Sequence, residues 1–195
     1  HEALRLRLRA LPKFGQGDPG ADGMTDRVLN TLCDGYASIR NRHRGRCKPV
    51  VLPFVWAPPA GAVLGASADG RLAGTPIAHG LTPQAVGMSE GIGSAVTSHA
   101  GLSLERVSGG ASSMWDFDPS LAKPEIVDNV LRTFLQLGGQ IFQGNTTDVD
   151  ELLDARKHPD DFPNLLVRVG GYSARFTTLA PALQDEIIGR YRHRS

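Results

Sequence analysis

The order of helix-forming and strand-forming segments in the second half of the chain most constrains its fold. Apolar residues recur with helical spacing in "PEIVDNVLRTFLQLGG", where Pro124 suits the first helical position and Gly138 suits the stop. Short β-rich runs lie before and after it. The predicted segments are strands at 111–117, 140–143 and 164–169 and helices at 124–139, 147–157 and 181–192. Strands that alternate with helices indicate an α/β fold.

The first half of the chain is less regular. Residues 1–12 alternate leucine with arginine, which fits either a half-buried strand or a short basic helix. Residues 25–40 have the spacing of an amphipathic helix, and 89–102 predict a second, shorter one. Residues 49–58, bordered by prolines, predict a buried strand, and 61–76 form a glycine-rich connection.

Composition excludes several classes of partner. The chain has 195 residues, 41% hydrophobic and 21% charged, which is ordinary for a globular protein. Its net charge of +1 creates no field that favours nucleic acid or a membrane surface. Prolines and glycines interrupt the apolar runs, so we expect no membrane-spanning helix. These features predict neither nucleic acid nor membrane as a partner. A single pair of cysteines, Cys33 and Cys47, is weak evidence for a disulfide scaffold, so we expect a reducing, cytoplasmic setting.

The common catalytic and metal-binding motifs are missing from the sequence. Cys33 and Cys47 do not have the spacing of a metal site, and the histidines form no H-x-x-x-H pair, so we predict no bound metal. Ser112 and Ser113 lack the G-x-S-x-G context of a hydrolase nucleophile. No glycine-rich nucleotide-binding loop is present.

One strand-forming run ends abruptly on two glycines. In "NLLVRVGGYSARFTTL", residues 164–179, apolar residues lead into Gly170 and Gly171, and an aromatic residue follows. Such a pair is most simply a turn that needs a positive φ. The other interpretation is that one of the glycines is itself the reactive group.

The second interpretation follows from a resemblance. "VRVGGYSARF" followed by "LQDEIIGR" resembles the C-terminal signature of the glycyl radical enzymes. "GASADGRLAGTPIAHGLTP", "LLDARKHPDDFPNLLVRV" and "LPKFGQGD" are similar to segments that precede that signature in the family. The resemblance covers nearly all of the chain.

The resemblance implies a fold and a division of the chain. Family members form a ten-stranded α/β barrel in which a glycine loop and a cysteine loop meet. This chain would supply the last elements of that barrel together with the glycine-loop domain. We expect residues 1–72 to end the pyruvate formate-lyase-like barrel domain and residues 73–195 to form the glycine radical domain.

The resemblance also implies where the chemistry resides. Gly171, the glycine directly before the tyrosine, matches the radical-bearing position and should lie at the tip of a buried loop between the strand and the last helix. Without a Cβ, its α-carbon radical can flatten between two amides without steric strain. Its neighbours in the radical loop are Arg168, Val169, Gly170, Tyr172 and Ser173.

The family mechanism needs groups from outside this chain. A radical-SAM activating enzyme with an Fe–S cluster installs the radical, so we expect no cofactor bound to the chain itself. The radical then passes to a catalytic cysteine, which neither Cys33 nor Cys47 matches. "IFQGNTT" and "MSEGIGSAV" also depart from the usual family patterns, which leaves the subfamily and substrate open.

Two functions are compatible with this resemblance. The chain is either the radical-bearing part of an enzyme related to formate acetyltransferase or to the lyases and dehydratases, or a non-catalytic spare part that repairs a larger partner. We expect an activating enzyme, the rest of the barrel or a larger chain, and a small-molecule substrate as partners, and a homodimer for the full-length protein. Candidate residues for lining the substrate cavity are Trp56, Ser113 and Trp115.

Overall fold

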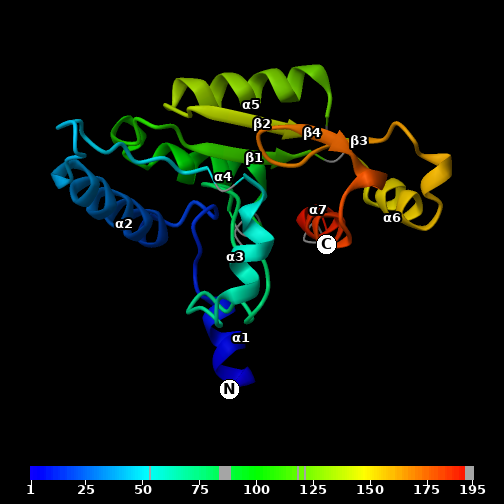
Figure 1. Cartoon of the computed structure of the whole chain (residues 1–195), viewed down its shortest axis with the longest axis horizontal. Helices are drawn as coiled ribbons and strands as arrows, with labels where there is room; N and C mark the ends of the chain where they lie inside the picture. The colour runs from blue at the N-terminus through cyan, green and yellow to red at the C-terminus, as the bar shows by residue number, and fades with distance from the viewer. Residues whose placement is uncertain (53, 84–88, 118, 121, 192–195) are drawn as a thin grey trace.

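The computed structural model describes residues 1–195 except 53, 84–88, 118, 121 and 192–195 (Figure 1). The main regular elements of the described part are α-helices of 7 to 20 residues and two separate pairs of strands, joined by 3-10 turns and irregular segments. In chain order these elements are α1 (Glu2–Ala10), α2 (Pro19–Ser38), α3 (Ala57–Val63), α4 (Gly91–Ala100), β1 (Ser112–Asp116), α5 (Pro124–Gln136), β2 (Ile141–Asn145), α6 (Val149–Lys157), β3 (Leu166–Arg168), β4 (Ser173–Arg175) and α7 (Pro181–Tyr191).

A β1–α5–β2 unit forms the centre of the molecule. β1 pairs in parallel with β2, from Ser112 opposite Ile141 to Asp116 opposite Asn145. Parallel neighbours need a crossover connection, and α5 provides it. The strands and the helix expected here are therefore confirmed, and so is the mixed α/β character of the chain.

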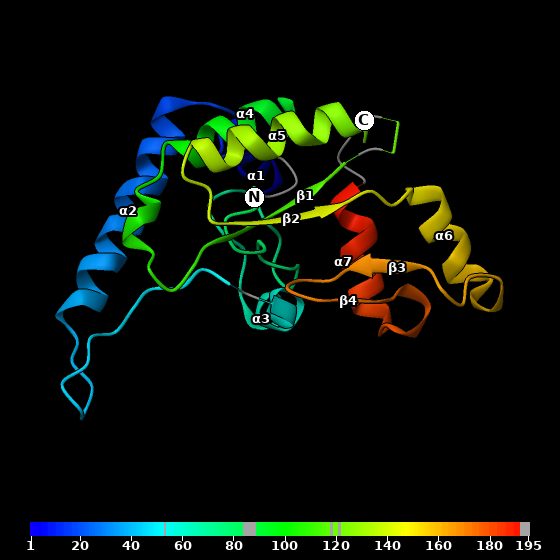
Figure 2. The ribbon, with the colours of Figure 1, turned by 90° about the horizontal axis from the view of Figure 1, so that it is seen from above.

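Two helices cover one face of this strand pair. α4 and α5 lie side by side next to β1 and β2 (Figure 2). Val96 of α4, Trp115 of β1 and Phe134 of α5 meet in one buried apolar cluster. The alternation of side chains along β1 therefore directs Ser113 and Trp115 toward the helices, and Ser112 and Met114 toward the opposite face.

A second unit follows it along the chain. β3 and β4 form an antiparallel hairpin in which Leu166 lies opposite Arg175 and Arg168 lies opposite Ser173. α6 and α7 pack beside this hairpin (Figure 1). The buried cluster that joins them comprises Leu152, Ala155, Val167, Val169, Phe176, Ile187 and Ile188.

The N-terminal segments are helical and largely exposed. Residues 1–12, which fit a strand or a helix, form α1. α2 begins after Asp18, whose side chain accepts a hydrogen bond from the Ala21 amide and so caps the helix. α2 buries only Leu29 and Cys33. A row of apolar side chains along α2 and at its C-cap stays exposed: Met24, Val28, Leu32, Tyr36 and Ile39.

The prediction of a buried strand at 49–58 is wrong. Within the described part of this segment, Val51 makes only an isolated parallel bridge to Ala111. A 3-10 turn at Phe54–Trp56 then leads into α3, which has prolines in its first turn. Proline suits the first turn of a helix because the amide there needs no intrahelical partner. Pro58, which suggested the C-terminal border of the strand, therefore lies in the first turn of α3 instead.

Among the described residues, no helix combines the length and apolar character needed to cross a membrane.

Candidate functional site

The two glycines form the tip of the β3–β4 hairpin. The amide of Val169 donates to the carbonyl of Tyr172 at 3.0 Å, which closes the turn around Gly170 and Gly171. Gly171 has a φ of 80°, the left-handed region that favours glycine and that a type II turn places at this position. The two glycines therefore do form a turn that needs a positive φ, as one interpretation predicted. This finding is compatible with an additional chemical role for Gly171.

The side chain of Gln143 anchors Gly171 to β2. The Gly171 amide donates to Oε1 of Gln143 at 2.7 Å, and Nε of Arg168 donates to the same oxygen at 3.1 Å. Gln143 itself is buried. The hairpin tip is thus tied to the central strand pair through one side-chain oxygen.

Arg190 of α7 holds the backbone that leads to the tip. Its Nη1 donates to the carbonyl of Arg168 at 2.9 Å, and its Nη2 donates to the carbonyl of Val169 at 2.7 Å. Glu186, one helical turn earlier, accepts from Nε at 2.8 Å and from Nη2 at 2.6 Å. Nε2 of His79 lies 2.8 Å from Oε1 of Glu186.

The buried carboxylate of Glu186 is charged despite its surroundings. Burial would raise the pKa of Glu186, but hydrogen bonds from His79 and Arg190 and the nearby positive charge of Arg190 outweigh it, so the pKa lies below its usual value. The side chains of Arg190 and Glu186 are only 9% and 7% exposed. This ion pair therefore acts out of contact with most of the solvent.

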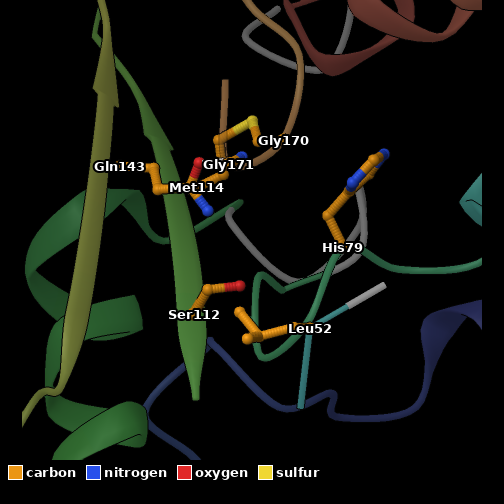
Figure 3. A pocket seen from close by; sticks show the side chains of 7 residues that line it. All are labelled: Leu52, His79, Ser112, Met114, Gln143, Gly170 and Gly171. Atoms are coloured by element: carbon orange, nitrogen blue, oxygen red, sulfur yellow. Dashed lines mark hydrogen bonds between the residues drawn. The ribbon is translucent and has the colours of Figure 1, made fainter. Parts of the chain in front are cut away.

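A small open pocket lies beside the hairpin tip (Figure 3). The backbone of Gly170 and Gly171 forms one side of it, and Met114 and Gln143, which are opposite each other in the β1–β2 register, form another. The residues that line the pocket are Leu52, His79, Ser112, Met114, Gln143, Gly170 and Gly171. Both polar and apolar groups therefore face Gly171.

The structure does not place the residues proposed for the substrate cavity beside this pocket. Ser113 and Trp115 lie on the other face of β1, fully buried, and Ser113 Oγ is 2.9 Å from Nε2 of His99. Strand alternation brings Ser112 and Met114 to the pocket instead. Trp56 is 65% exposed and lies outside the residues that line it.

The expected burial of the glycine loop holds for only one of the two glycines. Gly170 is buried, whereas Gly171, Tyr172 and Ser173 are exposed in this chain. The tip position between β3 and α7 is as expected, but the buried environment of Gly171 is not present. The reason is physical: the elements of this chain cover the hairpin on one side only, toward β2 and α7.

A family model described as "Glycine radical" matches residues 77–177, which is more than half of the chain. The chain belongs to the glycyl radical enzyme family. The matched region includes the hairpin and its two glycines, together with His79 and Gln143.

Known proteins extend the comparison to almost the whole chain. The trans-4-hydroxy-L-proline dehydratase of Clostridioides difficile is 32% identical over 191 residues, which cover 96% of this chain and 24% of that protein. The probable dehydratase YbiW of Escherichia coli K12 is 35% identical over 206 residues, which cover 99% of this chain and 25% of that protein. The chain thus spans about a quarter of the length of these relatives.

The fold agrees with that of a solved glycyl radical enzyme. The glycerol-bound B12-independent glycerol dehydratase of Clostridium butyricum superposes with a TM-score of 0.91 at 30% identity, and the match covers 97% of this chain and 25% of that protein. The chain is therefore a mixed α/β segment that matches the C-terminal quarter of these enzymes.

Several residues of the site were missed by reasoning from the sequence. Glu186 and Arg190 lie in "LQDEIIGR" and His79 in "GTPIAHG", so the family resemblance included them without assigning them a role. Gln143 ends the strand predicted at 140–143, whose sequence departs from the usual family pattern, and it was assigned no role. Glu186 and Arg190 have the i,i+4 spacing of a local helix pair, but their contacts with His79 and the hairpin span 21 to 111 positions, and no local pattern signals those.

Proposed function

We propose that this chain is the radical-bearing part of a glycyl radical enzyme and that Gly171 stores the radical. The observation that carries the proposal is the setting of Gly171: it occupies the tip of a hairpin beside a pocket, and side chains from β2 and α7 hold the backbone around it. Its exposed face leaves the α-carbon open to a reacting group from another part of the protein. The arrangement supports hydrogen-atom transfer at that carbon.

The proposed chemistry moves one hydrogen atom at a time. A radical-SAM activating enzyme takes a hydrogen atom, one proton with one electron, from Gly171 Cα, which leaves the carbon radical delocalised over the flanking amides. Gly171 Cα later recovers a hydrogen atom from the thiol of a catalytic cysteine outside this chain. The resulting thiyl radical takes a hydrogen atom from the substrate and returns it after the substrate has reacted.

The relatives favour elimination or bond cleavage over acetyl transfer. The two relatives described above and the glycerol enzyme are named as dehydratases. We therefore place the complete protein among the dehydratases and related lyases that act on small molecules, with a formate acetyltransferase-like activity as the less favoured alternative. The substrate itself would be bound by residues beyond this chain together with the pocket beside Gly171.

The exposed apolar surface supports association with more protein. The row along α2 and the exposed Trp56 and Val63 near α3 need a partner surface in water. We propose the rest of the barrel as that partner, with residues 1–72 belonging to the barrel domain and 73–195 to the glycine radical domain. A cytoplasmic location and a homodimer of the full-length protein complete this proposal.

A spare-part subunit is the second candidate, and it also accounts for the exposed apolar row along α2, which a larger partner would cover. In that role the chain would complete a larger partner whose own glycine loop is damaged. The two candidates differ in a simple mixing experiment. If the chain is a spare part, adding it as a separate polypeptide to a glycyl radical enzyme that has been cleaved at its glycine should restore activity. If the chain is the covalently continuous radical-bearing part of a larger enzyme, the same addition should not restore activity.

Electron paramagnetic resonance after anaerobic activation of the complete protein tests the proposal. We expect a doublet from the single remaining α-hydrogen, which collapses when that hydrogen is exchanged for deuterium. Gly171→Ala should abolish the doublet, because a methyl group crowds the planar centre and changes the splitting. Gly170→Ala should keep part of the signal.

A glycine elsewhere controls for backbone strain. Gly138 also has a positive φ, 88°, and a Cβ there would meet nothing within 4 Å, so Gly138→Ala introduces strain similar to that of Gly171→Ala without approaching the site. It should keep the doublet in full. If Gly171→Ala keeps the doublet and Gly170→Ala loses it, the radical is on Gly170. If neither substitution changes the doublet, the proposal fails.

A further inference from the structure

The guanidinium of Arg190 is in contact with the radical loop but has no part in the chemistry proposed above. We infer that Arg190, oriented by Glu186 and His79, is a positioning residue that sets where Gly171 lies for hydrogen-atom transfer. This inference rests on the proposed function. It assigns a role to a buried ion pair that otherwise looks only structural.

The hydrogen bonds of Arg190 converge on the last peptide groups before the glycine pair. Nη1 and Nη2 donate to the carbonyls of Arg168 and Val169, at 2.9 and 2.7 Å. Because the guanidinium is planar and its N–H groups have a fixed geometry, it sets the direction of both carbonyls together. The chain therefore enters the turn in one orientation.

Glu186 and His79 in turn fix the guanidinium. Glu186 accepts from two nitrogens of Arg190, and Nε2 of His79 lies 2.8 Å from the same carboxylate. The three side chains are at most about a tenth exposed, so solvent competes little for these bonds. A residue before β1, two residues of α7 and the hairpin are thereby linked in one network.

The tip needs such support from the protein. Two adjacent glycines have more backbone freedom than any other dipeptide, and Gly171 is exposed. Gln143 holds the amide of Gly171 from the β2 side, while Arg190 holds the preceding carbonyls from the α7 side. Hydrogen transfer depends steeply on the distance between the reacting atoms, so a tip held from two sides is suited to it.

The test uses Arg190→Lys in the complete protein. Lysine keeps a positive charge beside Glu186, but its single ammonium group cannot replace the planar fork that reaches both carbonyls and the carboxylate. Hydrogen exchange is followed in peptides that cover the hairpin, 166–175, and in the core strand, 112–116. We expect exchange in the hairpin to become about tenfold faster while exchange in the core strand stays unchanged.

A nearby arginine gives the matched control. Arg156 of α6 forms an ion pair with Asp185, next to Glu186 in sequence but on the exposed side of α7. Arg156→Lys makes the same chemical change and should leave hairpin exchange unaltered. His79→Gln should produce a smaller acceleration in the same hairpin peptide, since its amide can still donate to Glu186.

Radical content separates positioning from simple support of the fold. After activation, Arg190→Lys should carry severalfold less radical per chain than the unsubstituted protein, with the core strand still protected. Unchanged hairpin exchange, or exchange that rises equally in both peptides, overturns the inference. If the unsubstituted protein shows no doublet, the proposed function fails, and hydrogen exchange still decides whether Arg190 holds the loop.

Discussion

The amide of Gly171 donates a hydrogen bond to the side-chain oxygen of Gln143, 2.7 Å away and 28 positions earlier in the chain. This bond fixes the orientation of the peptide group that precedes the Gly171 α-carbon. A radical on that carbon would be delocalised over that same peptide group. Gln143 is therefore placed to influence both where the radical site lies and how planar it can become.

Replacement of Gln143 by leucine should loosen the hairpin tip. Gln143→Leu preserves most of the side-chain volume but removes the acceptor shared by the Gly171 amide and Arg168. We expect hydrogen exchange at 166–175 to become about tenfold faster and the radical content to fall. Gln136→Leu, at an exposed position at the end of α5, is the control and should change neither measurement. Equal effects of the two substitutions would contradict a specific role for Gln143.

Oxygen should cleave the activated protein at the radical glycine. A carbon radical at Gly171 reacts with dioxygen, and the chain then breaks at that residue. Mass spectrometry of the activated protein after exposure to air should detect a new fragment that begins after Gly171 and contains residues 172–195 of this sequence. The fragment should be missing in Gly171→Ala and in protein that was never activated. Cleavage next to Gly170 instead would place the radical there.

The stability of the chain should depend on pH through His99. His99 is almost fully buried beside Ser113, and burial lowers its pKa from 6.5 to about 4. Above pH 6.5 both the folded and the unfolded state hold a neutral imidazole, so this contribution is constant. Between pH 6.5 and about 4 only the unfolded state takes up the proton, so the free energy of unfolding falls as the pH falls, by about 3 kcal/mol in total.

Urea unfolding at pH values from 7.5 to 5 measures this slope. The double substitution His99→Phe with Ser113→Ala removes the titrating ring without leaving a buried hydroxyl unpaired, and it should flatten the dependence on pH. Ser113→Ala alone keeps His99 and should keep the slope. An unchanged slope in the double variant would assign the effect to other groups.

The exposed apolar row on α2 should make the isolated 195-residue chain associate. Val28 and Leu32 are 53% and 54% exposed, and they lie in a continuous row with Met24 and Tyr36. We expect oligomers in light scattering and binding of a hydrophobic dye. Val28→Lys with Leu32→Lys should reduce both, because lysine is compatible with the helix. Thr31→Lys, exposed on the same helix outside this row, is the control. A monodisperse monomer that binds no dye would contradict the prediction.

Much of the local structure was readable from the sequence. The apolar spacing of 124–139 predicted α5 because a helix that covers a strand pair needs one continuous apolar face, and the structure has that helix at Pro124–Gln136. The paired glycines after an apolar run predicted the turn at Gly170 and Gly171 for a similar reason, since few residues other than glycine accept a φ of 80°.

Tertiary structure decided the rest. The alternation in β1 shows that Ser112 and Met114 share one face and that Ser113 and Trp115 share the other, but only the packing of α4 and α5 determines which pair faces the pocket. Likewise, the sequence of α7 contains Glu186 and Arg190 one turn apart, whereas their hold on the hairpin depends on how α7 docks. Periodicity and turn preferences act between near neighbours in the chain, so they determine the elements. Contacts between distant residues depend on how the whole set of elements packs, and the site around Gly171 is built from such contacts.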